Sequence, residues 1–131
     1  MNQVPLSDLR VLVIDDDRQI LSQAESILNN LGISHVHLVS HADDGLEAFD
    51  NDYLDIVFLD LCLDEHSGVD LIMRLGKAQP AVKCVIMSAA AEKILESIEL
   101  LAKKCGVQVL GRIRKPLTPE QFEDILEKLG K

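Results

Sequence analysis

Short apolar segments alternate with segments of helical periodicity along the chain, and this alternation constrains the fold more than any other feature. The apolar segments are rich in β-branched residues, which is the pattern of strands buried on both faces. They are RVLVID (10–15), HVHLVS (35–40), DIVFLD (55–60), VKCVIMS (82–88) and VQVLG (107–111). Five strand–helix repeats with short connections imply right-handed crossovers. The sequence therefore predicts an α/β fold in which helices cover both faces of a parallel sheet.

Apolar residues spaced three and four apart predict a helix after each strand. The predicted helices cover 20–31, 42–51, 67–77, 94–102 and 118–130. Asp17 is suited to cap the first helix rather than to bind a metal, because acidic residues stabilise a helix N-terminus. Thr118 and Gln121 form a capping-box pattern at the start of the last helix, with Pro119 in its first turn. With 131 residues and no linker segment, the chain is predicted to be one domain.

Charge and hydrophobicity argue against two classes of protein. The net charge is −9, with 22 acidic and 13 basic side chains and no basic cluster in the sequence, which argues against direct binding of nucleic acid. The longest apolar segments have the length of strands, so no membrane span is predicted. The N-terminus lacks the pattern of a secretory signal, and we therefore expect a cytoplasmic protein.

Polar residues stand where the predicted strands end. They are Asp15 and Asp16 after the first strand, Asp60 after the third, Ser88 after the fourth and Lys115 shortly after the fifth. Ligands bind outside the carboxyl ends of strands in open parallel sheets, so these side chains should converge at one edge. Clustered carboxylates repel each other, and Mg²⁺, which prefers oxygen ligands, would offset that repulsion. A hydroxyl and an ammonium suit an anion and a carboxylate can attack phosphorus, so the pattern predicts an aspartyl-phosphate site.

On these residues the chain resembles the receiver domains of two-component response regulators. The resemblance covers nearly the whole chain and is carried by IDDD (14–17), FLDLCL (58–63) followed by SG (67–68), VIMSAA (85–90) and RKP (114–116). It implies a (βα)5 doubly wound sheet with the flavodoxin-like strand order 2-1-3-4-5. The partners it implies are a histidine kinase or phosphotransfer protein as phosphodonor, an output domain in the same chain or a separate partner protein, and a second copy in a homodimer.

The resemblance also implies the phosphoacceptor and the metal ligands of the site. Asp60 is the expected phosphoacceptor. Asp15, Asp16 and Asp60 are expected to bind Mg²⁺, together with the backbone carbonyl of Cys62. In this arrangement the chain would accept a phosphoryl group and pass a signal to its output.

The expected phosphoryl-binding residues are Ser88, Ala89 and Lys115. The bond between Lys115 and Pro116 is a candidate for the cis form, because X-Pro bonds adopt cis at low cost. Ser88 and Arg112 are expected on the switch and output face. Family members commonly have an aromatic residue at the position of Arg112, so a switch built on an aromatic rotamer is not expected here.

Two further departures concern loops and helices. Asp64 stands where family members usually have proline, which leaves the rigidity of that loop open. The segment between Ser88 and Lys115 is longer than usual in the family, and AAAEKILESIELLAKKCG (89–106) is expected to form a lengthened fourth helix.

The output of the domain is suggested by a second, narrower resemblance. The segment LLAKKCGVQVLGRIRKPLTPEQF (100–122) resembles receivers that precede an EAL-type cyclic-di-GMP phosphodiesterase domain. This implies that residues 1–131 are one receiver domain within a larger protein. As an isolated domain it is expected to have no enzyme activity beyond self-phosphorylation and autodephosphorylation.

Two alternatives in other functional classes remain open from the residues alone. In a haloacid-dehalogenase-type phosphatase, the pair Asp15-x-Asp17 would supply the nucleophile, although threonine does not follow Asp17 and Asp60 would have no role. In a receiver-like interaction module, Asp60 would never be phosphorylated. A Rossmann-type nucleotide site is unsupported, because no glycine-rich turn follows the first strand.

Overall fold

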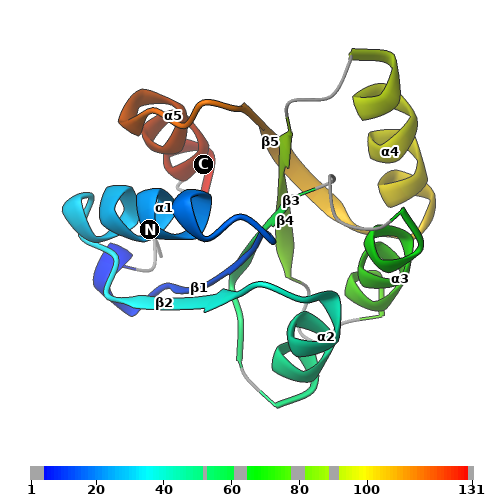
Figure 1. The fold of residues 1–131 in the computed structure, drawn as a ribbon, viewed down its shortest axis with the longest axis horizontal. Coiled ribbons are helices and arrows are strands. Elements are labelled where there is room, and N and C mark those ends of the chain that lie inside the picture. Colours follow the sequence, from blue (N-terminus) through cyan, green and yellow to red (C-terminus); the bar gives the residue numbers. More distant parts are fainter. Residues whose placement is uncertain (1–4, 52, 61–64, 78–81, 89–91, 130–131) are drawn as a thin grey trace.

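A parallel sheet of five strands forms the centre of the molecule (Figure 1). The computed structural model describes residues 5–51, 53–60, 65–77, 82–88 and 92–129. The strands are β1 (Arg10–Ile14), β2 (His35–Val39), β3 (Ile56–Asp60), β4 (Lys83–Ser88) and β5 (Gln108–Arg114). Their order is β2-β1-β3-β4-β5, and each neighbouring pair is parallel. The doubly wound sheet with strand order 2-1-3-4-5 is thus confirmed.

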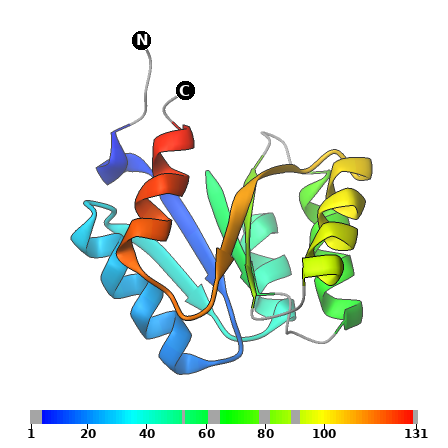
Figure 2. The ribbon, with the colours of Figure 1, turned by 90° about the horizontal axis from the view of Figure 1, so that it is seen from above.

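Helices cover both faces of the sheet. They are α1 (Arg18–Asn30), α2 (Ala42–Asn51), α3 (Glu65–Leu75), α4 (Glu92–Lys104) and α5 (Pro119–Leu129), preceded by the short 3₁₀ helix η1 (Leu6–Asp8). Figure 2 shows α1 and α5 on one side of the sheet and α2, α3 and α4 on the other. Among the described residues, none of the helices combines the length and the apolar character that crossing a bilayer requires.

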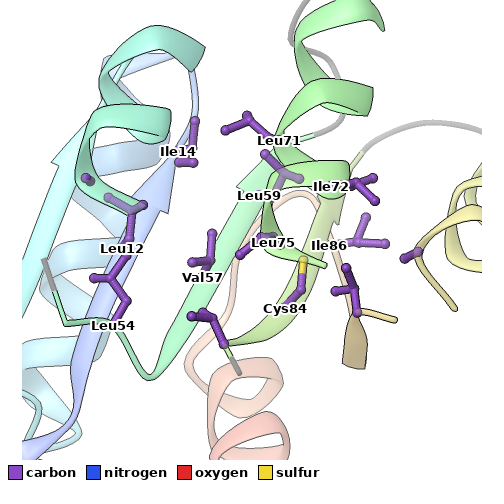
Figure 3. Close-up of a cluster of buried hydrophobic side chains, with 14 of the residues drawn as sticks. Leu12, Ile14, Leu54, Val57, Leu59, Leu71, Ile72, Leu75, Cys84 and Ile86 are labelled. Carbon is purple, nitrogen blue, oxygen red and sulfur yellow. The ribbon is translucent and has the colours of Figure 1, made fainter. Parts of the chain in front are cut away.

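Two buried clusters flank the sheet, because successive side chains of a strand point to opposite faces. The cluster under α2, α3 and α4 contains Leu12, Val57, Leu59 and Ile86 from the strands (Figure 3). The cluster under α1 and α5 contains Val11, Val13, Phe58, Val85 and Phe122, and the rings of Phe58 and Phe122 stack with centroids 5.1 Å apart. Burial of one such side chain contributes about 1.5–3 kcal/mol, so this double core holds the strand ends in place.

The predicted helix caps at both ends of the chain are confirmed. Asp17 caps α1, and its side chain accepts a hydrogen bond from the backbone N–H of Gln19 at 2.9 Å. At α5, the backbone N–H of Thr118 donates to Oε1 of Gln121 at 2.9 Å, and the backbone N–H of Gln121 donates to Oγ1 of Thr118 at 3.4 Å. Each contact satisfies a backbone donor that the helix itself leaves unpaired.

The fourth helix is shorter than predicted. It ends at Lys104, whereas the expected helix ran to residue 106. Cys105 and Gly106 form a turn instead, and Gly106 has φ of 84°, which no residue of a right-handed helix adopts. Residues 89–91 of the predicted helix lie outside the described residues.

The fifth strand is longer than predicted, because it continues past Gly111 to Arg114. Its register with β4 shifts within the strand: Cys84 pairs with Val109 and Val85 pairs with Gly111, so Leu110 is an extra residue in a bulge. Leu110 and Ile113 pack on the α1–α5 side, while Val109 packs on the opposite side. The bulge thus reverses the alternation of side chains and directs Ile113 to the core.

Candidate phosphoacceptor site

Three polar side chains are buried at the carboxyl ends of the central strands. Asp15 directly follows β1, Asp60 ends β3 and Ser88 ends β4, and their exposed fractions are 0%, 0% and 1%. The backbone N–H of Asp15 donates to the carbonyl of Val39 at 3.2 Å, which continues the pairing of β1 with β2. Buried ionisable groups destabilise a fold unless they are paired, so this group of residues indicates a functional site.

Lys115 connects these strand ends. Its Nζ lies 2.8 Å from Oδ2 of Asp15 and 3.2 Å from Oδ1 of Asp60. Its backbone N–H donates to the carbonyl of Ser88 at 3.1 Å. The lysine side chain is only 17% exposed, so water has little access to either ion pair and salt weakens the two pairs little. One ammonium therefore serves two buried carboxylates.

Asp16 adds a third carboxylate. One oxygen from each of Asp15, Asp16 and Asp60 lies within 4.8 Å of the others, and Asp16 is exposed at the edge of the group. Three carboxylates beside the single ammonium of Lys115 leave an excess of two negative charges among these residues. The donor set, oxygen atoms with this excess charge, fits a hard divalent cation such as Mg²⁺.

The local electrostatics agree with an excess of negative charge. Burial raises the pKa of Asp15, and the charge of Asp60 raises it further, against the opposing effects of Lys115 and of the Asp17 backbone N–H. That N–H donates to Oδ1 of Asp15 at 2.9 Å. Burial alone lowers the pKa of Lys115, but its contacts with Asp15 and Asp60 outweigh burial and raise it. Lys115 is therefore a permanent cation at neutral pH.

The structure brings five residues of the expected site to one edge of the sheet: Asp15, Asp16, Asp60, Ser88 and Lys115. The bond between Lys115 and Pro116 is cis. Cys62, Ala89 and Asp64 lie outside the described residues.

The predicted end of the fifth strand at residue 111 had implied that Arg112 lies in the following loop. In the structure Arg112 lies within β5. Its Nε forms an ion pair with Oε2 of Glu99 in α4. The exposed fractions of the two side chains are 30% and 24%, so the pair is partly buried between the helix and the sheet. This contact joins α4 to β5 at the position where family members commonly have an aromatic residue.

Two side-chain contacts near the site could not be predicted from the sequence. Glu99 was one acidic residue among several on the fourth helix, and nothing in the local sequence indicated its contact with Arg112, 13 positions away. Gln121 was recognised as part of a capping box, but its Nε2 also donates to the carbonyl of Arg114 at 2.8 Å. Its position three residues after Thr118 signalled the cap and gave no sign of the second contact.

Comparison with known proteins places this geometry in a family. The response regulator receiver domain model matches residues 11–127, and the chain belongs to this family. The chain is 26% identical over 124 residues to the chemotaxis protein CheY of Thermotoga maritima, covering 93% of this chain and 98% of that protein. A CheY-like receiver domain structure from Methanospirillum hungatei is 28% identical, with a TM-score of 0.77 and coverage of 93% of this chain and 94% of that one.

Other relatives are longer than this chain. It is 24% identical over 120 residues to the C4-dicarboxylate response regulator DctR of Bacillus subtilis, covering 91% of this chain but 51% of DctR. Because the chain belongs to a family of signalling domains, the comparisons argue against a haloacid-dehalogenase-type phosphatase, in which Asp15 would be the nucleophile. The EAL-type output stays a prediction, since these relatives are described as chemotaxis and dicarboxylate-response proteins.

Proposed function

We propose that this receiver domain accepts a phosphoryl group on Asp60 from a histidine kinase or phosphotransfer protein. The observation that carries the proposal is the position of Lys115, whose ammonium contacts both buried carboxylates, Asp15 and Asp60, at the ends of β1 and β3. A carboxylate held at a strand end beside a cation and a hydroxyl has the surroundings that phosphoryl transfer requires. These features also argue against a module that is never phosphorylated.

The proposed step is a single displacement at phosphorus. An oxygen of Asp60 forms the new bond to phosphorus. The bond that breaks joins phosphorus to the leaving atom of the donor, which is a histidine nitrogen in a phosphohistidine or a carboxyl oxygen in an acyl phosphate. The electron pair of that bond leaves with the donor group. Lys115 offsets the negative charge of the incoming phosphoryl oxygens, and the hydroxyl of Ser88, at the end of β4, is proposed to donate a hydrogen bond to them.

The residues that would hold Mg²⁺ are Asp15, Asp16 and Asp60, whose oxygens are grouped within 4.8 Å. The resemblance adds the backbone carbonyl of Cys62, which lies outside the described residues. When bound, the ion would reduce the repulsion between these carboxylates and a phosphodonor dianion.

The experiment measures intact mass after incubation with acetyl phosphate and Mg²⁺. We expect a phosphoryl adduct on the wild type, almost none in excess chelator, and none on Asp60→Asn. Asp70→Asn is the matched control, because Asp70 is exposed on α3. Either an adduct on Asp60→Asn or the lack of an adduct on the wild type would overturn the proposal.

The signal is proposed to leave through α4 and β5, where Arg112 and Glu99 pair. DctR and DltR of Streptococcus agalactiae, of which this chain covers 51% and 37%, are longer than this chain and are consistent with an output domain in the same protein, whereas CheY of Thermotoga maritima, covered to 98%, is consistent with a separate partner. The finer proposal, from the resemblance of residues 100–122, is an EAL-type cyclic-di-GMP phosphodiesterase. Hydrolysis of cyclic-di-GMP by the full-length protein, with and without phosphodonor, tests it, and an unchanged or absent hydrolysis rate would contradict it.

A further inference from the structure

The loop between β5 and α5 carries Lys115, and the side chain of Gln121 contacts both ends of that loop. At one end, Nε2 of Gln121 donates to the carbonyl of Arg114, the last residue of β5, at 2.8 Å. At the other end, Oε1 accepts from the backbone N–H of Thr118 at 2.9 Å. A single amide group therefore links the residue before Lys115 to the start of α5.

The two contacts of this amide have different consequences. Acceptance from Thr118 is half of the capping box and stabilises the start of α5. The hydrogen bond to Arg114 contributes nothing to that cap, because the Arg114 carbonyl belongs to the strand. It fixes the backbone immediately before Lys115.

Lys115 is thereby held from two sides. Its N–H donates to the carbonyl of Ser88 in β4, and the carbonyl of the same peptide group, which belongs to Arg114, accepts a hydrogen bond from Gln121 in α5. From this fixed backbone its Nζ reaches Asp15 at 2.8 Å and Asp60 at 3.2 Å. Small displacements of a catalytic group reduce transfer rates strongly, so a support of this backbone is expected to affect the transfer rate.

We propose that Gln121 is a positioning residue for phosphoryl transfer, acting through the Arg114 carbonyl on Lys115. It does not act on the phosphoryl group itself. The inference rests on the proposed function of Asp60, and it separates a kinetic role of Gln121 from its role in helix capping.

The chain offers a substitution that separates the two roles. Gln121→Glu keeps an oxygen that accepts from Thr118 but lacks the N–H donor to Arg114. Combining it with Glu120→Gln keeps the net charge of that helix turn, and Glu120 is exposed. Gln121→Ala removes both contacts. Gln23→Glu, at an exposed position of α1, is the control for an added charge elsewhere.

The measurements are the rate of Asp60 phosphorylation at saturating acetyl phosphate, its half-saturating concentration, the melting temperature and the exchange of the Lys115 amide proton by NMR. For Glu120→Gln/Gln121→Glu we expect a saturating rate about three- to tenfold lower, faster exchange of the Lys115 amide and a melting temperature lower by only the few degrees that one lost hydrogen bond costs. Gln121→Ala should show the same rate loss together with a larger drop in melting temperature, because it loses the helix cap as well. Gln23→Glu should match the wild type.

The results distinguish failure of this inference from failure of the proposed function. If the wild type forms no adduct, the proposed function is wrong. The exchange of the Lys115 amide then tests the positioning role by itself. Faster exchange in the double variant supports this role, and unchanged exchange overturns it. In a wild type that is phosphorylated, a double variant with an unchanged rate overturns the inference whatever its amide exchange. A rate loss confined to Gln121→Ala would likewise assign Gln121 to capping alone.

Discussion

The backbone N–H of Lys115 donates a hydrogen bond to the carbonyl of Ser88 at 3.1 Å, which fastens the loop after β5 to the end of β4. From this point the lysine side chain extends toward the ends of β1 and β3, where its ammonium meets Asp15 and Asp60. Lys115 therefore contacts the ends of three strands, and the charge balance of the site depends on it.

Replacement of Lys115 by Met should destabilise the metal-free protein. The substitution keeps a long unbranched side chain but removes the charge that two buried carboxylates share. Loss of one partner from a buried ion pair typically lowers the free energy of unfolding by about 3 kcal/mol or more. Chemical denaturation in chelator at pH 7 measures this, with Lys103→Met, at an exposed position of α4, as control. A loss no greater than that of the control would contradict the charge pairing.

Mg²⁺ should stabilise the protein through the three grouped carboxylates. By linkage, a concentration one hundred times Kd raises the free energy of unfolding by about 2.7 kcal/mol. Asp16→Asn should lose most of this response and melt at a higher temperature than the wild type in chelator, because one repelling charge is gone. Glu123→Gln, exposed on α5, controls for a general effect of net charge. An Asp16→Asn variant that is less stable than the wild type in chelator would show that repulsion is not the dominant effect.

Cys84 should make the stability of the protein fall at alkaline pH. Burial raises the pKa of this thiol from 9.0 to about 12, so the folded state favours the protonated form. Between these two values the unfolded chain loses the proton first, and each pH unit therefore lowers the free energy of unfolding by up to about 1.4 kcal/mol. Compared with Cys84→Ala, the wild type should lose stability from pH 9 upward. Parallel stability curves for the two proteins at pH 8 to 11 would contradict this burial effect.

The fold and the convergence of the site were predictable because each depends on short-range patterns. Continuous apolar runs predicted the strands, and the polar residues directly after them, such as Asp15 and Asp60, had to share one edge of a parallel sheet. The end of β5 was predicted too early, because Arg112 and Arg114 lack the hydrophobicity of a buried strand. Both lie on an edge strand whose side chains are incompletely covered: Arg112 is half-buried and Arg114 is exposed.

Contacts between distant elements were not predictable in the same way. The bulge at Leu110 changes which side chains of β5 face the core, and a single extra residue leaves no periodic signature in so short a strand. Gly76 at the end of α3 packs so closely on the turn after α4 that a Cβ there would overlap the backbone oxygen of Cys105. Such approaches follow from how helices pack on the sheet, which local patterns do not specify.

The ion pair of Arg112 with Glu99 should couple the two residues energetically. The pair is partly buried between β5 and α4, and partly exposed pairs of this kind contribute about 1 kcal/mol or less. A double-mutant cycle with Arg112→Ala and Glu99→Gln isolates that contribution, because the other contacts of Arg112 cancel in the cycle. A coupling energy near zero would show that the contact does not stabilise the fold.

The same pair should also influence phosphorylation if the signal leaves through this face. Ser88 pairs with Arg114 and Ile86 pairs with Arg112 across β4 and β5, so the site and the ion pair share adjoining strands. A rearrangement of this face that breaks the pair on phosphorylation would cost the coupling energy of the pair. By reciprocity, Glu99→Gln should then raise the phosphorylated fraction at a fixed, subsaturating donor concentration by up to about fivefold. Glu96→Gln, exposed on the same helix, is the control, and equal fractions in the two variants would exclude the pair from the switch.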